Sequence, residues 1–227
     1  ACTFDIPEDA EKGDYFNVVL VSGGNDVSAW TVLVTNDSDE YTPAYEEKLV
    51  VPGEETKSAP TFTKTGEDEE GNPTEEKVDT PEGSKFAIPE DYTAPEGYKV
   101  IIDKTTGEIT VTFPDKSKLD GDTVEEFDVP VTVTYPDGSS DDASAKFKLD
   151  TDGDGTPDKE DTDDDGDGIP DEKEKEDGTN PKAPNQNLDF EPEYEDGSGK
   201  PGDDVTVPAP TFKDKDGNDT EAPEGTK

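Results

Sequence analysis

Apolar and polar residues alternate along two neighbouring stretches of the chain. Every second residue from 127 to 135 is apolar, and so is every second residue from 143 to 149. A period of two directs one set of side chains into a core and the other into solvent, which predicts β-strands. The intervening Pro-Asp-Gly-Ser-Ser at 136–140 is typical of turns. We therefore predict a β-hairpin over residues 127–149, with Pro130 at a sheet edge or a bulge, because proline cannot donate a ladder hydrogen bond.

A second hairpin is predicted directly upstream. Residues 98–113 read YKVIIDKTTGEITVTF, with β-branched runs on either side of Thr-Thr-Gly at 105–107. The glycine can adopt the positive φ that a tight hairpin turn needs. The preceding segment, residues 59–92, is rich in turn-forming residues and is interpreted mainly as loops. Because no segment has the spacing of an amphipathic helix, the pattern predicts an all-β fold.

Internal similarity indicates repeated β domains. Residues 209–220, APTFKDKDGNDT, resemble residues 59–74, APTFTKTGEDEEGNPT, at a spacing of about 150 residues, and residues 3–21 resemble residues 111–133. Four segments are therefore predicted: the C-terminal part of a preceding β domain at 1–36, a complete β-sandwich at 41–149, an acidic linker at 150–187 and the N-terminal part of a following domain at 188–227. We expect the chain to be part of a longer protein, with Trp30 in the core of the preceding domain.

Three stretches of the predicted complete domain carry a family resemblance. They read PGEETKSAPTF at 52–62, IPEDYTAPEGYKVIIDKTTGEITVTF at 88–113 and VPVTVTYPDGSSDDASAKFKL at 129–149. These stretches resemble the long variety of the Rib domain, which occurs as tandem repeats in cell-wall-anchored surface proteins of Gram-positive bacteria. The resemblance implies Ig-like β-sandwiches in tandem, forming the stalk of an extracellular, cell wall-attached adhesin. Because its motifs are turns and strands, it implies a fold rather than a chemistry.

The composition limits the possible partners. Among 227 residues, 62 are acidic and 20 are basic, which gives a formal net charge of −42, and only 26% are hydrophobic. Such a composition is otherwise typical of disordered chains, so the case for a folded chain depends on the β pattern. The negative charge repels nucleic acid and anionic membranes, and no apolar run is long enough to span a bilayer. We expect no nucleic-acid partner, no membrane insertion and a monomer.

The residue types argue against an enzyme. The chain has no His and a single Cys, Cys2, so neither a Ser/His/Asp triad nor a Cys/His dyad can form, and zinc or haem sites are not indicated. Cys2 has no partner for an internal disulfide. No Gly-rich loop precedes a predicted helix, so a phosphate-binding cradle is not indicated either. We expect no catalytic residues.

The most distinctive segment is DTDGDGTPDKEDTDDDGDGIPDEKEKE at residues 150–176. Calcium takes six to eight oxygen ligands, and an EF-hand loop supplies them from positions 1, 3, 5, 7, 9 and 12, with Gly at position 6 for a sharp turn. Counting from Asp150, and again from Asp163, places an acidic residue at positions 1, 3, 5, 9 and 12 and Gly at position 6 both times. The repeated pattern predicts two calcium-binding loops.

Two predicted ligand sets result from this count. They are Asp150, Asp152, Asp154, the carbonyl of Thr156, Asp158 and Asp161 in the first loop, and Asp163, Asp165, Asp167, the carbonyl of Ile169, Asp171 and Glu174 in the second. Prolines at position 8 and the lack of flanking helical patterns argue against an EF-hand pair. The segment instead resembles thrombospondin type 3 repeats, in which Asp-rich loops with little secondary structure wrap calcium. That resemblance implies that neighbouring loops can share ligands, which leaves the roles of Asp161 and Asp164 open.

Other interpretations of the acidic segment stay open. It could be a solvated spacer without a specific ion, or a magnesium site, although magnesium demands near-octahedral geometry and keeps several waters. A catalytic carboxylate pair would need a cleft that a linker does not offer. If calcium binds, we expect the linker to shorten and stiffen, because mutual repulsion otherwise extends it.

The sequence therefore predicts a structural stalk. Its expected partners are neighbouring repeats of the same chain, while a host or cell-surface ligand would be bound by a tip domain elsewhere in the protein. In the alternative, the β-sandwich is itself a binding module for a host glycan or protein. The aromatic residues that could form such a surface are Tyr41, Tyr45, Tyr92 and Tyr98. Such residues more often pack against prolines or cap a sandwich.

Overall fold

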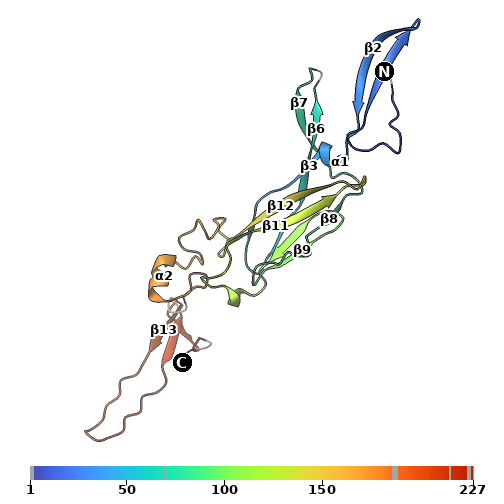
Figure 1. Ribbon diagram of the computed structural model, residues 1–227. Helices are drawn as coiled ribbons and strands as arrows, with labels where there is room; N and C mark the ends of the chain where they lie inside the picture. Colours follow the sequence, from blue (N-terminus) through green and yellow to red (C-terminus); the bar gives the residue numbers. More distant parts are fainter. Residues whose placement is uncertain (1–2, 69, 186–188, 215, 224–225, 227) are drawn as a thin grey trace.

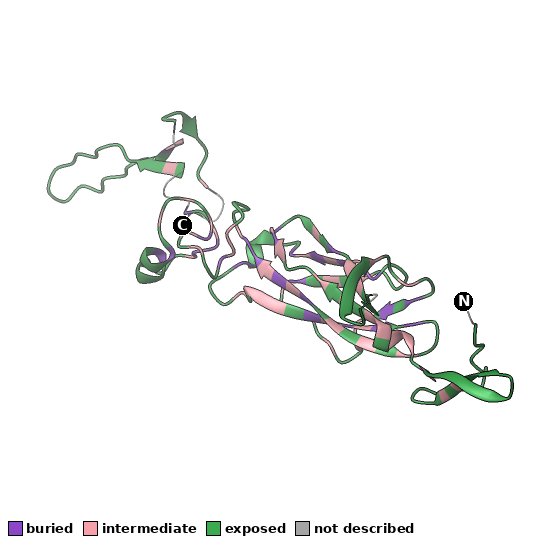
Figure 2. Ribbon diagram, turned by 90° about the horizontal axis from the view of Figure 1, so that it is seen from above, coloured by how far each residue is buried: buried purple, intermediate pink, exposed green. Residues whose placement is uncertain are grey.

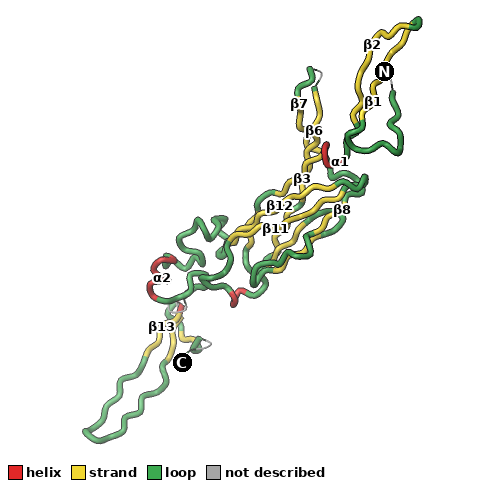
Figure 3. The backbone as a smooth tube through the Cα atoms, in the orientation of Figure 1, coloured by secondary structure: helices red, strands yellow, loops and turns green. Residues whose placement is uncertain are grey.

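The computed structural model describes residues 3–68, 70–185, 189–214, 216–223 and 226 of the chain. Within these residues the regular structure is mostly β-strand, and the helices are short (Figures 1 and 3). The predicted all-β class is therefore confirmed. No helix of the described residues has the length and hydrophobicity that crossing a membrane requires. The predicted lone thiol, Cys2, lies outside the described residues.

Two sheets and part of a third contribute to one core in the central body. One has the order β5–β10–β9, formed by Glu55–Ser58, Ile109–Thr112 and Lys99–Ile102. The other has the order β4–β12–β11–β8, formed by Lys48–Val50, Ser140–Leu149, Glu126–Thr134 and Lys85–Ala87. Neighbouring strands are antiparallel except β4 and β12, which run parallel. This arrangement is consistent with an Ig-like β fold.

The remaining elements extend the central body. A third sheet, β3–β6–β7, consists of Tyr41–Tyr45, Pro60–Glu67 and Pro73–Val78. The hairpin β1–β2 spans Tyr15–Ser22 and Asn25–Leu33, and the sheet β13–β14–β15 spans Phe190–Glu193, Thr211–Asp214 and Asp219–Thr220. Short helices include α1 (Asp37–Glu40), the 3-10 helix η1 (Lys116–Lys118) and α2 (Asp171–Asp177). The β1–β2 hairpin and the β13–β15 sheet lie beyond opposite ends of the central body (Figure 1).

The alternating pattern accounts for the core. Val129, Val131 and Val133 of β11 are at most 1% exposed, and Phe147 and Leu149 of β12 are fully buried. The residues between them face outward or are partly covered, as the strand period requires. Figure 2 shows that buried residues concentrate in the central body and in the segment that comes after it, whereas the terminal hairpins are mostly exposed. Each large apolar side chain buried in this way contributes about 1.5–3 kcal/mol to stability.

Both predicted hairpins are present. The pairing of β9 with β10 places Ile102 opposite Ile109, and that of β11 with β12 places Val131 opposite Ala143. Pro130 is in register with its partner on β12, so it does not form a bulge. The other neighbour of β11, strand β8, pairs only with residues 132–134, so Pro130 lies in a part of β11 where β8 does not extend.

The β6–β7 hairpin differs from the sequence-based expectation that residues 59–92 are mainly loops. Phe62 is 1% exposed and belongs to the core, but most of the hairpin beyond it is exposed on both faces and so has no alternating pattern. Local hydrogen bonds close its turn: Asp68 Oδ1 accepts from the backbone N–H groups of Glu70 at 2.9 Å and Asn72 at 2.8 Å. Cross-strand pairing with β3 adds the remaining support.

Trp30 is not buried within the described residues, so its expected place in the core of a preceding domain stays a prediction. Trp30 lies opposite Val18 in the β1–β2 hairpin and is 39% exposed, while Tyr15 and Leu33 are exposed by 66% and 60%. The hairpin is a sheet of two strands, and no second sheet of the described residues covers it. Alternation correctly located these strands, but burial also requires a facing layer.

The last sheet resembles the beginning of the central body in its register. Phe62 lies opposite Pro43 in the β3–β6 pair, and Phe212 lies opposite Pro192 in the β13–β14 pair. Phe212 is 8% exposed. The internal similarity of the sequence therefore has a counterpart in strand pairing. The boundaries of the four predicted segments stay predictions.

Candidate metal centre

The two Asp-rich loops have the same backbone hydrogen-bonding pattern. In each loop, the Asp at position 1 accepts from the N–H at position 6, position 3 accepts from position 5, and position 5 accepts from position 7. The pairs are Asp150–Gly155, Asp152–Asp154 and Asp154–Thr156 in the first loop, and Asp163–Gly168, Asp165–Asp167 and Asp167–Ile169 in the second, with donor–acceptor distances from 2.7 to 3.0 Å. Repeating ligand spacing thus produces repeating loop geometry.

Glycine is required at position 6 by the backbone. Gly155 has φ +98° and Gly168 has φ +92°, in a region that side chains with a Cβ rarely adopt. This turn lets the carboxylate at position 1 reach the N–H at position 6. The same turn allows the Asp side chains at positions 1, 3 and 5 to converge.

The carboxylates converge in two separate clusters. Asp150, Asp152 and Asp154 each offer an oxygen, and these atoms all lie within 4.8 Å of one another. The Asp residues at 163, 165 and 167 form the second cluster by the same criterion. Three like charges at such distances repel one another unless protons or a cation compensate them. The structure therefore brings together the predicted ligands at positions 1, 3 and 5 of both loops.

Position 12 differs between the loops. Glu174 is fully buried in α2, and its Oε1 accepts from Asn185 Nδ2 at 2.7 Å. In the first loop, Asp161 Oδ1 instead accepts from the backbone N–H groups of Thr162 at 2.6 Å and Asp163 at 3.0 Å. The acidic side chain at the end of the second loop, Glu174, is thus held by an amide. The acidic residue at the end of the first loop, Asp161, instead accepts hydrogen bonds from the backbone that leads into the second loop.

Helix α2 positions Glu174 and was not predicted. The helix starts after Pro170 and ends at Gly178, which has φ 77°. Proline beside the start of a helix and glycine just after its end are recognised local signals of helix boundaries. The sequence therefore carries both boundary signals of this helix. With only seven residues the helix lacks the length for an apolar stripe, which is why periodicity did not identify it.

The acidic residues at position 9 accept hydrogen bonds from the backbone at position 2 of their own loop. Asp158 Oδ1 accepts from the N–H of Thr151 at 2.7 Å, and Asp171 Oδ1 accepts from the N–H of Asp164 at 2.9 Å. Neither is among the residues of the two clusters. The structure thus gives these two predicted ligands a part in holding position 2 of each loop.

Several buried oxygens of the second loop have no hydrogen-bond partner and so make this loop the stronger candidate for holding a cation. Among the described residues of this loop, the buried oxygens without a hydrogen-bond partner are Asp163 Oδ1, Asp164 Oδ1, Asp165 Oδ2 and Glu174 Oε2. Burial and then the neighbouring carboxylates raise the pKa of Asp165 to about 7, and burial raises the pKa of Glu174 as well. A buried polar atom without a partner costs about 1–3 kcal/mol, and more if charged. Clustered carboxylate oxygens fit a hard divalent cation such as calcium.

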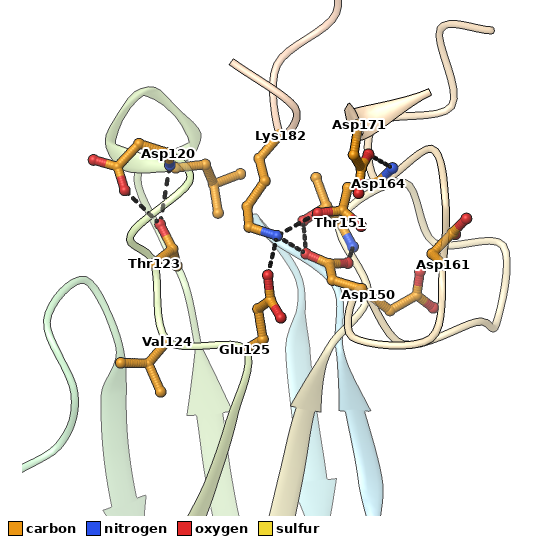
Figure 4. Close-up of polar contacts among 12 residues, drawn as sticks. Asp120, Thr123, Val124, Glu125, Asp150, Thr151, Asp161, Asp164, Asp171 and Lys182 are labelled. Atoms are coloured by element: carbon orange, nitrogen blue, oxygen red, sulfur yellow. Dashed lines mark hydrogen bonds and ion pairs between the residues drawn. The ribbon is translucent and has the colours of Figure 1, made fainter. Parts of the chain in front are cut away.

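Lys182 connects the loops to the central body and was not among the predicted site residues. Its Nζ lies 2.9 Å from Glu125 Oε1, 2.8 Å from Asp158 Oδ2 and 2.5 Å from Asp164 Oδ2. Figure 4 shows the lysine pointing between Glu125, on the central body, and Asp164, on the second loop. Its partners are 57, 24 and 18 residues away in the sequence, so no local pattern could have identified it.

The tyrosines considered for ligand binding pack onto the core instead. Tyr41, Tyr45 and Tyr92 are partly buried against it, and Tyr98 is 8% exposed. The hydroxyl of Tyr98 donates to the carbonyl of Val124 at 2.5 Å, and that of Tyr45 donates to the carbonyl of Gly107 at 2.8 Å. Stacking on a sugar would require an exposed aromatic face. This packing gives the binding-module alternative no support.

Comparison with known proteins identifies the family of the central body. Residues 38–150 match the family model of the Long Rib domain. No curated protein sequence matches the chain. Among solved structures, the M1 domain from titin is similar at 11% identity and a TM-score of 0.25, with 50% of this chain and 95% of that chain covered.

Two further solved structures share weak similarity. For titin kinase and its flanking domains the identity is 15% and the TM-score 0.23, with 54% of this chain and 19% of that chain covered. For the protocadherin gamma B7 extracellular cadherin domains 1–4 the values are 9% and 0.20, with 93% and 50% covered. TM-scores this low carry no argument about fold or function, so only the family match bears on the function of this chain.

Proposed function

Residues 38–150 are a Long Rib domain, a repeat of Gram-positive surface proteins, and from this premise we propose that the chain is a segment of an extracellular, cell wall-attached stalk whose joint is stiffened by calcium. The observation that carries the proposal is the pair of Asp clusters, each with three carboxylates within 4.8 Å, directly after the last strand of the domain. The surface protein would be an adhesin, with the ligand-binding tip in another part of the protein.

The geometry of the Rib domain supports a serial arrangement. The chain enters through α1 and β3 at one end of the central body and leaves from β12 at the other (Figure 1). Domains with connections at opposite ends can be joined in a row, and each added domain then lengthens the stalk. The backbone N–H of Asp37 donates to Asp137 Oδ2 at 2.7 Å, which fixes the entering segment to the β11–β12 turn.

Calcium would act on loops whose backbone is already arranged. The cluster residues with Glu174 and the carbonyls of Thr156 and Ile169 would hold the ions. The positive charge of a bound calcium ion would offset the repulsion between the carboxylates. Its coordination would hold the ligand residues of each loop together. Extracellular modules of this kind bind calcium with dissociation constants of about 10⁻⁴–10⁻³ M, so the sites would be filled outside a cell. Neighbouring domains would then be held at a restricted angle.

Calcium titration of the whole chain by calorimetry, combined with small-angle scattering in calcium and in chelator, tests the proposal. We expect two ions per chain and a narrower distribution of particle dimensions in calcium than in chelator. Magnesium at the same concentration serves as the control and should have a weaker effect on both measurements. No calcium binding at millimolar concentration would mean that residues 150–176 are a solvated acidic spacer.

A further inference from the structure

The Lys182 ammonium lies in a pocket built of carboxylates from three parts of the chain. Glu125 comes from the Rib domain, Asp158 from the first loop and Asp164 from the second, and each places an oxygen within 2.9 Å of Nζ. The side chain of Lys182 is 1% exposed, and those of Asp158 and Asp164 are 1% and 3% exposed. A buried ammonium is tolerated only with such compensation, and the buried carboxylates need the ammonium equally.

Two predicted calcium ligands, Asp158 and Asp171, have carboxylate oxygens that already accept hydrogen bonds from Lys182 or from the residue at position 2 of their own loop. Both oxygens of Asp158 are used, because Oδ1 accepts from the N–H of Thr151 and Oδ2 accepts from the Thr151 hydroxyl and Lys182. Asp164, whose role the sequence left open, accepts from Lys182 through Oδ2, and the N–H of Asp164 holds the predicted ligand Asp171. None of these residues belongs to the clusters that converge on a single point. The ammonium of Lys182 thus offsets part of the negative charge of Asp158 and Asp164.

Residues on either side of Lys182 also contact both the Rib domain and the second loop. Asn180 Nδ2 donates to the carbonyl of Leu119 in the Rib domain at 2.8 Å, and Asn180 Oδ1 accepts from the backbone N–H of Lys182 at 3.1 Å. Three residues further, the N–H of Asn185 donates to Asp167 Oδ2 of the second loop at 2.8 Å. We call residues 180–185 the clasp, because they contact the Rib domain at one end and the second loop at the other.

The first loop is attached to the Rib domain by its backbone too. The N–H of Asp150 donates to the carbonyl of Val50 on β4 at 2.9 Å, and the N–H of Asp158 donates to the carbonyl of Leu149 at 2.8 Å. The second loop has no comparable backbone bond to the Rib domain among the described residues. Its connection to that domain is made through the clasp and the first loop.

We propose that Lys182 is a built-in cation that docks the Asp-rich segment, residues 150–177, on the end of the Rib domain and so sets the direction in which the chain leaves it. This inference goes beyond calcium binding, because the ammonium is covalently part of the chain and acts in chelator as well. Calcium would order the interior of each loop, whereas Lys182 fixes both loops to the domain.

The test measures the distance between spin labels on the two parts in chelator. The substitutions Lys85→Cys in the Rib domain and Glu172→Cys in α2, both at exposed positions, carry the labels, with Cys2→Ser as background. Lys182→Met removes the charge and keeps most of the buried stem. Lys173→Met is the matched control, since it removes the same charge from the same segment at a position 55% exposed.

The expected result is one narrow distance in the parent chain and in Lys173→Met, and loss of that single peak in Lys182→Met. Glu125→Gln provides a second variant in case Lys182→Met fails to fold, because it neutralises only the Rib-domain carboxylate, which is 32% exposed. It should broaden the distribution in the same direction. A narrow peak in Lys182→Met, or a broad distribution in the parent chain in chelator, would overturn the proposal whatever the outcome of calcium titration.

Discussion

Individual carboxylates of the Asp-rich segment differ in their contacts although they are chemically alike. Asp165 lies in a cluster and has a buried oxygen without a partner, whereas Asp158 has both oxygens hydrogen-bonded behind its loop. The difference arises from loop position: positions 1, 3 and 5 converge, and position 9 turns back to the N–H at position 2. Substitutions at this scale should therefore have separable effects.

Asp165→Asn should remove calcium from the second loop. The substitution replaces one of the converging carboxylates by a neutral and weaker ligand. Calorimetry should then detect one ion fewer, or an affinity for that ion at least about tenfold lower, which corresponds to ~1.4 kcal/mol. Asp177→Asn, in an exposed residue of the same segment, should bind calcium like the parent chain. Equal binding by the two variants would contradict the assignment of the second cluster.

Calcium affinity should depend on pH near neutrality. Because the folded-state pKa of Asp165 is raised from 3.8 to about 7, its proton stabilises the calcium-free loop at low pH, and this contribution is lost as the pH rises through about 7. Calcium competes with that proton, so its dissociation constant should rise by up to about tenfold per pH unit below 7. Calorimetry at about pH 6 and pH 8 checks this, with proton release as a second signal. Affinity that is constant over this range would argue against a protonated Asp165.

At the scale of elements, the sandwich and the loops depend on different forces. The paired strands β11 and β12 bury every second side chain in the core, and Phe127 stacks on Phe147 with ring centroids 5.9 Å apart. The loops have almost no apolar interior and rely on Asp–backbone hydrogen bonds and on Lys182. A destabilising substitution in the core should therefore lower the stability of the Rib domain whether or not calcium is present.

Phe147→Ala should destabilise the Rib domain by about 3–5 kcal/mol, because it leaves a cavity where a fully buried ring was packed. Denaturant unfolding, followed by near-ultraviolet circular dichroism in calcium and in chelator, measures the loss. The comparison is Val124→Ala, at a position 40% exposed, which should cost no more than about 0.5 kcal/mol. If both variants unfold at the same denaturant concentration, the placement of Phe147 in the core is wrong.

At the scale of the whole molecule, Lys182 and the strand contacts combine the Rib domain and the Asp-rich segment into one unit. Ion pairs of Lys148 with Glu160 and of Lys159 with Glu126, both at 3.3 Å, add exposed contacts across the same junction. Exposed pairs of this kind contribute at most about 1 kcal/mol each, so the buried Lys182 cluster dominates. Binding events in the segment should accordingly influence unfolding of the domain.

Calcium should raise the unfolding temperature of the Rib domain itself. Binding to the folded state alone contributes about 0.6–1.8 kcal/mol per ion at ~2 mM calcium, given dissociation constants of ~10⁻⁴–10⁻³ M. Scanning calorimetry should record this shift in the parent chain and a smaller one in Lys182→Met, whose segment is no longer docked. An identical shift in the two proteins would mean that segment and domain unfold together without the lysine.

Much of the Rib domain could be predicted from the sequence, because strand alternation and turn residues are local. The hairpins at 98–113 and 127–149 were predicted for that reason, whereas the β6–β7 hairpin was missed because its exposed faces give no alternation. The Asp clusters were predicted from ligand spacing alone. The calcium that would occupy them is still a prediction, as is the resemblance to thrombospondin type 3 repeats.

The sequence by itself determined the β class, the Rib resemblance and the convergence of the carboxylates in each loop, since each depends on residues a few positions apart. Only the tertiary structure decided the partners of Lys182, the direction of Asp158 and the exposure of Trp30. These depend on which distant segments fold side by side, and on whether a second layer covers a sheet. Neither property is encoded in the spacing of neighbouring residues.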